Sequence, residues 1–291
     1  MKYDFKTMFI LVSLFLISQI IGLGILYKDM EVKIGPTGAQ EIMHTETVLG
    51  PRPEIQGFET FVWLISATAI STVMVLIIVW LKKVNWWKSL FFISVFLTIA
   101  LALGTLMDPT FAFLLAFIIA VWKIYRPNAI IHNVAQVLMF SGIAVLLVPL
   151  FDLIWIVVLL IVISLYDVYA VYKSKHMVKM ALFQVKSKLF AGISLPLKKV
   201  KKGRRKRKVK AAIIGGGDVA FPLLFAGVVM ENLIKLGLAI EIAFLKTLII
   251  PIIVSLTLIV LFLKGGEGKF YPGMPFLTAG CLIAYAIISL V

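Results

Sequence analysis

Apolar runs of about 20 residues alternate with short polar stretches along almost the whole chain. A helix needs roughly 20 apolar residues to cross a bilayer. The runs predict nine transmembrane helices, at about 7–27, 59–81, 87–107, 109–125, 128–150, 152–172, 211–230, 238–263 and 274–291. We find no internal repeat, so the pattern predicts an all-α polytopic membrane protein with a single membrane domain over residues 1–291.

The connections between these helices are short, with two exceptions. Residues 28–58 form a polar segment rich in Gly, Pro, Thr and Glu, and residues 173–210 form a basic one. Within the basic segment, 174–190 is expected to be an amphipathic helix on the membrane surface. The N-terminus begins like a signal peptide, but its apolar run extends to Leu26 without a small-x-small cleavage site, which predicts a retained first helix.

Composition agrees with a membrane protein, because 62% of residues are hydrophobic, 15% are charged and the mean hydropathy is +1.06. Soluble domains are about half apolar and a quarter charged. The single cysteine, Cys281, excludes an intrachain disulfide, and the three scattered histidines do not predict a metal site.

The net charge of +15 is unevenly distributed. Of the 29 Lys and Arg residues, 24 fall on one side of the predicted helices and five on the other. The positive-inside rule then places the N-terminus and 173–210 in the cytoplasm, and 28–58 and the C-terminus outside. The run KKVKKGRRKRKVK at 198–210 is typical of nucleic-acid or anionic-lipid binding, but we interpret it as a topological anchor, with no nucleic-acid partner.

Two acidic residues, Asp167 and Asp218, lie inside predicted helices. An Asp at mid-bilayer costs about 2.5–3.5 kcal/mol on insertion scales, and such residues usually mark function. Asp167 precedes Lys173 by six residues, about 9 Å of helix, and Asp218 follows Lys210 by eight, about 12 Å. If the two helices are neighbours, the carboxylates meet at similar depth near the cytoplasmic surface.

Two close carboxylates at low dielectric share one proton. One can then accept a proton from water while the other donates a hydrogen bond to a scissile carbonyl, as in aspartic proteases. Paired membrane acids also bind Na⁺ or relay protons, so a cation- or proton-coupled transporter is the alternative, although we see no second half with a matching broken helix. A non-catalytic scaffold for membrane helices is a third possibility.

Glycine and proline residues occur close to the acids in the sequence. Gly215, Gly216 and Gly217 weaken the start of the helix and leave room for an extended substrate segment to bind as an added strand. Pro222 removes the backbone donor that would bond the carbonyl of Asp218. The segment YPGMPFLTAG, from Tyr271, begins the last helix irregularly on the same side, although proline is also common in an ordinary first turn.

These motifs occur in an order that resembles the presenilin and signal peptide peptidase family. The sequence has YD at Tyr166 and Asp167, G-x-G-D ending at Asp218, and P-x-L at Pro275 and Leu277. ISLYDVYAV resembles the sixth helix of presenilins, and GGGDVAFPLLF resembles the signal peptide peptidase motif. Nine helices with a cytoplasmic N-terminus resemble presenilin topology.

The resemblance implies an intramembrane aspartyl protease with Asp167 and Asp218 as catalytic pair and no metal or cofactor. It places Tyr166, Gly215, Gly216, Gly217, Pro275, Phe276 and Leu277 around the active site. Phe276 departs from the family, which usually has alanine there. Substrates would be transmembrane helices or signal-peptide remnants in the lipid bilayer, and obligate partner subunits are not implied. The lack of disulfides and of long extramembrane domains, together with the basic profile, favours a prokaryotic plasma membrane, which suits an archaeal homologue with its active site toward the cytoplasm.

Overall fold

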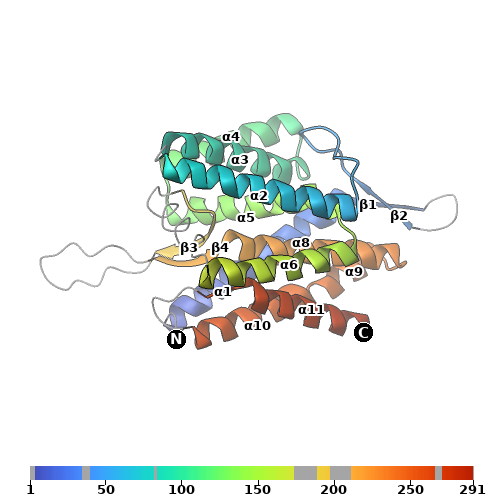
Figure 1. The fold of residues 1–291 in the computed structure, drawn as a ribbon. Coiled ribbons are helices and arrows are strands. Elements are labelled where there is room, and N and C mark those ends of the chain that lie inside the picture. The colour runs from blue at the N-terminus through green and yellow to red at the C-terminus, as the bar shows by residue number, and fades with distance from the viewer. Residues whose placement is uncertain are drawn as a thin grey trace, which may run out of the picture.

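Helices make up most of the protein in the computed structural model, which describes residues 4–34, 40–81, 84–173, 189–196, 211–265 and 271–290 (Figure 1). The first part of the chain forms α1 (Phe5–Asp29), β1 (Met30–Ile34), β2 (Gln40–His44), α2 (Phe58–Trp80), α3 (Val84–Gly104) and α4 (Pro109–Tyr125). The second forms α5 (Ala129–Leu147), the 3-10 helix η1 (Val148–Leu150), α6 (Leu153–Tyr172), β3 (Gly192–Pro196), β4 (Ala211–Gly215), α8 (Gly216–Lys235), α9 (Ile240–Thr247), α10 (Ile249–Lys264) and α11 (Met274–Leu290). The basic run at 198–210 and all but the last two residues of the expected surface helix lie outside the described residues.

Every predicted span coincides with a helix over most of its length, except 238–263, which is divided between α9 and α10. Within the described ranges, seven helices are long and apolar enough to cross a membrane, counting α9 and α10 as one. The apolar helices α4 and α11 have 17 residues each, or about 26 Å at 1.5 Å per residue, slightly less than the ~30 Å hydrocarbon core. The protein is therefore a multi-helix membrane protein, while nine complete spans and their orientation stay predictions.

The helix α8 lies at the centre of the bundle. It contacts α1, α5, α6, α10 and α11, and nearly all of its side chains after Asp218 are buried. The helix α5 joins this central group to α3 and α4, which pack on its other side (Figure 1). Because α8 is buried on all sides, the two ends of this helix are fixed by contacts from several neighbours.

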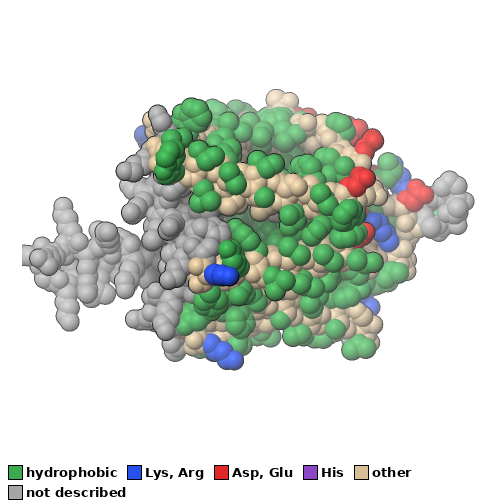
Figure 2. Space-filling view, viewed as in Figure 1, with side chains coloured by type: hydrophobic (Ala, Val, Ile, Leu, Met, Phe, Trp, Pro, Cys, Tyr) green, Lys and Arg blue, Asp and Glu red, His purple; other side chains and the backbone are tan. Residues whose placement is uncertain are grey.

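The outer surface is apolar along the length of the helices. In the view of Figure 2, hydrophobic side chains cover the middle of the molecule, and acidic side chains gather at the end where β1 and β2 lie. We call this the distal end, and we call the opposite end, with the start of α1 and the β3–β4 hairpin, the proximal end (Figure 1). An apolar belt between charged ends suits a molecule surrounded by lipid.

The start of the predicted seventh span is a strand. Residues 211–215 form β4, which pairs antiparallel with β3 from Gly192↔Gly215 to Pro196↔Ala211, and the helix begins only at Gly216. Three consecutive glycines destabilise a helix by roughly 1 kcal/mol each, whereas an extended backbone finds hydrogen-bond partners in β3. The prediction of helix over 211–215 was therefore wrong, although the fold as a whole is mostly helical, as predicted. Because a strand rises ~3.3 Å per residue and a helix ~1.5 Å, the backbone advances about 18 Å from Ala211 to Asp218, against about 10 Å for a continuous helix.

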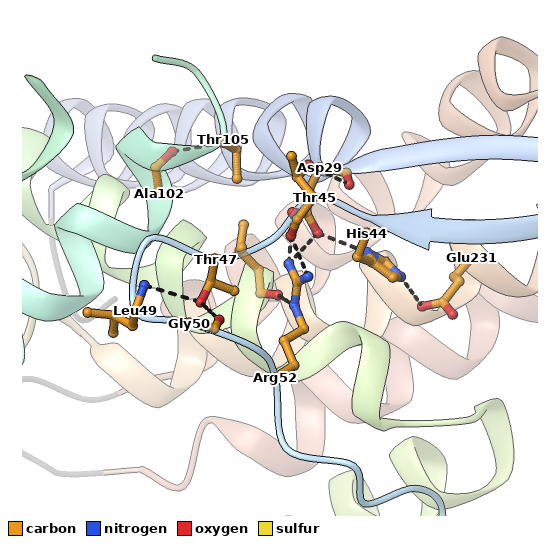
Figure 3. Close-up of polar contacts among 11 residues, drawn as sticks. Asp29, His44, Thr45, Thr47, Leu49, Gly50, Arg52, Ala102, Thr105 and Glu231 are labelled. Carbon is orange, nitrogen blue, oxygen red and sulfur yellow. Dashed lines mark hydrogen bonds and ion pairs between the residues drawn. The ribbon is translucent and has the colours of Figure 1, made fainter. Parts of the chain in front are cut away.

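A second hairpin, β1–β2, lies in the 28–58 segment, which the sequence predicted only as a loop. It is held by a buried polar cluster at the distal end (Figure 3). Arg52 Nη2 donates to both carboxylate oxygens of Asp29, at 2.8 and 2.9 Å, and His44 Nδ1 lies 2.9 Å from Asp29 Oδ2. His44 Nε2 lies 3.8 Å from Oε2 of Glu231 on α8, and Lys235 Nζ lies 2.7 Å from Glu231 Oε1. The segment is thereby tied to the last residue of α1 and to the distal part of α8.

His44 makes the stability of this connection dependent on pH. Burial lowers its pKa, but the hydrogen bond to Asp29 and the proximity of Glu231 outweigh burial, so the pKa lies above the usual 6.5. A histidine with a raised folded pKa stabilises the fold below its unfolded pKa, and this contribution is lost as pH rises through the folded pKa.

We therefore expect the wild-type protein to lose thermal stability relative to the variant His44→Gln as the pH rises from about 6.5 into the alkaline range. Unfolding temperatures in detergent, measured for both proteins across this range, test the expectation. Parallel curves for the two proteins would show that His44 does not link folding to pH.

Candidate active site

Asp167 lies one turn before the end of α6, and its side chain points into the protein. The residue is 3% exposed, whereas its neighbour Tyr166 is 43% exposed. The Asp167 Oδ2 atom accepts a hydrogen bond of 3.1 Å from the backbone amide of Met274, the first residue of α11. Its other oxygen, Oδ1, is buried and has no hydrogen-bond partner within the described part of the chain. One oxygen of this carboxylate is thus fixed, and the other is available to a second group.

The contact between α6 and α11 continues one turn away. Ser164 Oγ lies 2.8 Å from Thr278 Oγ1, and both residues are buried. Ser164 precedes Asp167 by three residues, and Thr278 follows Met274 by four, so the two contacts lie on the same faces of the antiparallel helices. This pair holds the start of α11 against Asp167.

Asp218 is the third residue of α8 and lies directly after the strand-to-helix junction. Gly215 is the N-cap, with extended backbone at φ −62° and ψ 150°. A methyl group on Gly215 would lie 3.0 Å from Asp218 Oδ2, so glycine leaves space for the carboxylate at the turn. Pro222 lies inside the helix and has no backbone N–H to donate to the carbonyl of Asp218.

The two acids meet at the start of α11. A methyl group on Gly273 would lie 2.8 Å from Asp218 Oδ1 and 3.1 Å from its Cγ, so the carboxylate of Asp218 lies against the backbone of Gly273. The next residue, Met274, donates its amide to Asp167. The structure therefore brings Asp167 and Asp218 onto one dipeptide, although the helical rise from which their similar depths were predicted does not apply to the strand before Asp218.

A small cavity of about 40 Å³ adjoins Asp218. It is lined by Ile213, Ile214, Asp218, Leu258, Leu261, Phe262, Tyr271 and Gly273. A cavity needs about 10–15 Å³ of such volume to hold one water if polar partners are present, so there is room for a water molecule beside the carboxylate. No group of three or more metal-ligating side chains occurs among the described residues.

The strand β3, which pairs with the strand that leads to Asp218, is fixed by polar side chains of α5. Asn133 Nδ2 donates to Ser194 O and Asn133 Oδ1 accepts from Ser194 N, both at 3.0 Å. His132 Nε2 lies 2.9 Å from Gly192 O, and Gln136 Nε2 donates to Phe190 O at 2.9 Å. The outer edge of β3 is therefore held by α5 instead of a third strand.

The other predicted site residues fall in two groups. Gly216 packs closely, since a methyl group there would lie 3.0 Å from the carbonyl of Ala191, whereas Gly217 is exposed. In the P-x-L element, Pro275 is half-buried, Phe276 is 41% exposed and Leu277 is fully buried in the core. The contact of this segment with the acids is made by the two residues before it.

Gly273 and Met274 were not predicted from the sequence as part of the site. Gly273 contributes by having no side chain beside Asp218, and Met274 contributes its backbone amide. The signal was the irregular YPGMP stretch, which favoured an ordinary helix start equally well. Nor was Gln19 of α1 predicted, whose Nε2 donates to the carbonyl of Val219 at 2.8 Å. Its signal was an amide within an otherwise apolar run.

Comparison with known proteins gives a consistent result. Residues 52–291 match the sequence model of the family described as signal-peptide peptidase, presenilin aspartyl protease. Two solved structures of a presenilin family intramembrane aspartate protease, in the C222 and P2 space groups, are similar to the whole chain. The first has 15% identity and a TM-score of 0.60, covering 97% of this chain and 98% of the other. The second has 17% identity and a TM-score of 0.58, covering 96% of each. A search of curated proteins found no match.

Proposed function

The chain belongs to the signal-peptide peptidase and presenilin aspartyl protease family, and on that premise we propose that Asp167 and Asp218 are its catalytic pair. The protein is an intramembrane aspartyl protease, and the match gives no support to the transporter alternative. The observation that carries the assignment of the two residues is their shared contact with Gly273 and Met274. This contact joins one acid from α6 to one from α8.

The chemistry follows from one proton shared by the pair. The ionised carboxylate accepts a proton from a water molecule as the water oxygen attacks the peptide carbonyl carbon, while the protonated carboxyl donates a hydrogen bond to the carbonyl oxygen. The tetrahedral intermediate then collapses, the C–N bond breaks, and the departing nitrogen takes a proton from the pair. The cavity beside Asp218 supports this mechanism because it offers space for the attacking water.

The substrate is a transmembrane helix that is locally unwound at the acids. Helical carbonyls are hydrogen-bonded, so the scissile bond has to be presented in extended form. The strand β4 ends in Gly215 and leads directly to Asp218, which supports binding of an extended substrate segment along this strand. Tyr166 and Phe276 flank the acids with exposed side chains, and we assign them, with Gly216, Gly217, Pro275 and Leu277, to the surround of the site.

The active site faces the cytoplasm in this proposal. The distribution of Lys and Arg along the sequence supports this orientation, since 24 of the 29 fall in segments predicted on the side of the N-terminus. The same charge profile supports a location in the plasma membrane. We further propose that the chain acts without obligate partner subunits.

A pH profile with a transition-state mimic tests the proposal. Because the pair needs one proton, cleavage of a purified membrane-helix substrate should fall at both low and high pH. A peptide mimic whose hydroxyl replaces the scissile carbonyl should inhibit competitively at the optimum. Activity that rises steadily with pH, without inhibition by the mimic, would point to a different chemistry.

A further inference from the structure

The helices α1 and α8 pack closely and run in the same direction, with residues in register along the contact. A methyl group on Gly22 of α1 would clash with Leu223 of α8, and one on Gly227 of α8 would lie 2.7 Å from Leu26 Cδ1. Each helix thus has a glycine where a large side chain of the other is accommodated. Such small residues allow membrane helices to approach closely, so the contact fixes how α8 lies against α1.

Gln19 continues this contact by one turn toward the proximal end. It precedes Gly22 by three residues, and its Nε2 donates to the carbonyl of Val219, which precedes Leu223 by four. Gln19 and Val219 are both fully buried, and Val219 directly follows Asp218. The amide of Gln19 therefore holds the peptide carbonyl next to the Asp218 residue.

Burying the side-chain amide of Gln19 inside the membrane costs free energy. Polar groups inside a membrane protein are usually kept for function, and Gln19 Oε1 is buried without a hydrogen-bond partner in the described part of the chain. A single hydrogen bond between membrane helices contributes only ~0.6 kcal/mol on average. Because an apolar side chain of similar size would fill the same space, stability alone does not account for a glutamine here.

The backbone around Asp218 explains what such a donor achieves. Pro222 cannot donate to the carbonyl of Asp218, and a proline ring also displaces the preceding turn of its helix. The first turn of α8, which carries the carboxylate, is therefore less restrained by its own hydrogen bonds than an ordinary helix start. A donor on α1 that binds the next carbonyl restores a fixed position for this turn.

We propose that Gln19 is a positioning residue for peptide-bond hydrolysis, acting through the Val219 carbonyl to hold the carboxylate of Asp218 in place. The assignment rests on the proposed function, since it requires Asp218 to be catalytic. Gln19 does not touch the substrate, so removing its donor lowers kcat and leaves KM unchanged. A shift of about 1 Å in a reacting group costs up to about a hundredfold in rate, and we expect a loss of tenfold or more for Gln19→Met (~10- to 100-fold).

The experiment compares three variants with wild type in a cleavage assay on a purified membrane-helix substrate. Gln19→Met keeps the volume and removes the donor. Gln19→Glu can donate to the Val219 carbonyl only while its carboxyl is protonated, so its activity relative to wild type should be high at low pH and fall as pH rises. Ser18→Ala is the matched control, because Ser18 is the adjacent residue of α1, is also fully buried and has no hydrogen-bond partner within the described residues. It should keep wild-type kcat.

The outcomes separate the possible roles of Gln19. A lower kcat for Gln19→Met at unchanged KM, with a falling relative pH profile for Gln19→Glu, supports the positioning role. Wild-type kcat in Gln19→Met overturns it. So does a Gln19→Glu variant whose activity relative to wild type does not change with pH and falls only because the variant is less stable to heat. Asp218→Asn, measured alongside, separates this result from the proposed function. If Asp218→Asn is inactive while Gln19→Met is fully active, only the role of Gln19 fails, and if Asp218→Asn cleaves, the catalytic pair fails first.

Discussion

Replacing either Asp167 or Asp218 by asparagine is expected to lower cleavage of a membrane-helix substrate by about 10³-fold or more. Asparagine has nearly the same size, but it neither accepts the proton of the attacking water nor shares a proton with the other carboxylate. The fold should persist, because an asparagine Oδ1 at position 167 still accepts the Met274 amide. Product formation by the purified variants, with thermal unfolding measured on the same samples, checks both expectations.

Two further variants make this prediction more specific. The double replacement of Asp167 and Asp218 should cost no more than either single one, because residues that act as a unit are not additive. Asp152→Asn is the matched control, since Asp152 caps the start of α6 through Trp155 N at 2.9 Å and asparagine caps equally well. It should retain wild-type activity. Clearly additive losses would show that the two acids act separately.

Gly273→Ala is expected to lower kcat by about tenfold to a hundredfold. The added methyl group would lie 2.8 Å from Asp218 Oδ1 and 3.2 Å from Oδ2, so the carboxylate or the start of α11 has to move. Because Met274 follows directly, a shift of this backbone also disturbs the amide that Asp167 accepts. Both acids are thus affected by one methyl group, and the steady-state kinetics of the purified variant measure the effect.

Gly24→Ala provides the control for this change. Gly24 lies within α1, and a methyl group there meets nothing within 4 Å. Alanine should leave kcat unchanged and raise stability by up to about 1 kcal/mol, as in other helices. If Gly273→Ala has the same kcat as Gly24→Ala, Gly273 does not hold the Asp218 carboxylate.

The features that could be predicted from the sequence are those that depend on the residues of one segment alone. Long apolar runs determine where helices form, because each must satisfy its own backbone in lipid. The pairing of Asp167 with Asp218 could also be predicted, since acids are rare in such runs and these two lie at the facing ends of consecutive spans. The family resemblance rested on the same few residues.

What the sequence could not predict depends on contacts between distant segments. The strand β4 forms because β3 offers partners and α5 holds β3 through His132, Asn133 and Gln136, more than 50 residues away. Periodicity reports on one element at a time, so Ala211–Gly215 looked like the start of an apolar helix.

The contributions of Gly273 and Gln19 were hidden for a similar reason. Gly273 acts by lacking a side chain against Asp218, and Gln19 acts on a carbonyl 200 residues away. At the distal end, Asp29, His44, Arg52 and Glu231 form no motif in the sequence, and their contacts became visible only in three dimensions (Figure 3). Polar residues acquire such roles from their neighbours in space.

The central claim, that Asp167 and Asp218 together hydrolyse the peptide bond, is tested most directly with the purified chain in liposomes. A single transmembrane-helix peptide is incubated with wild type, Asp167→Asn or Asp218→Asn, and the products are identified by mass spectrometry. We predict two complementary fragments, cut within the membrane-spanning part, from wild type and none from either variant. The same fragments from both variants would contradict the assignment of the catalytic pair.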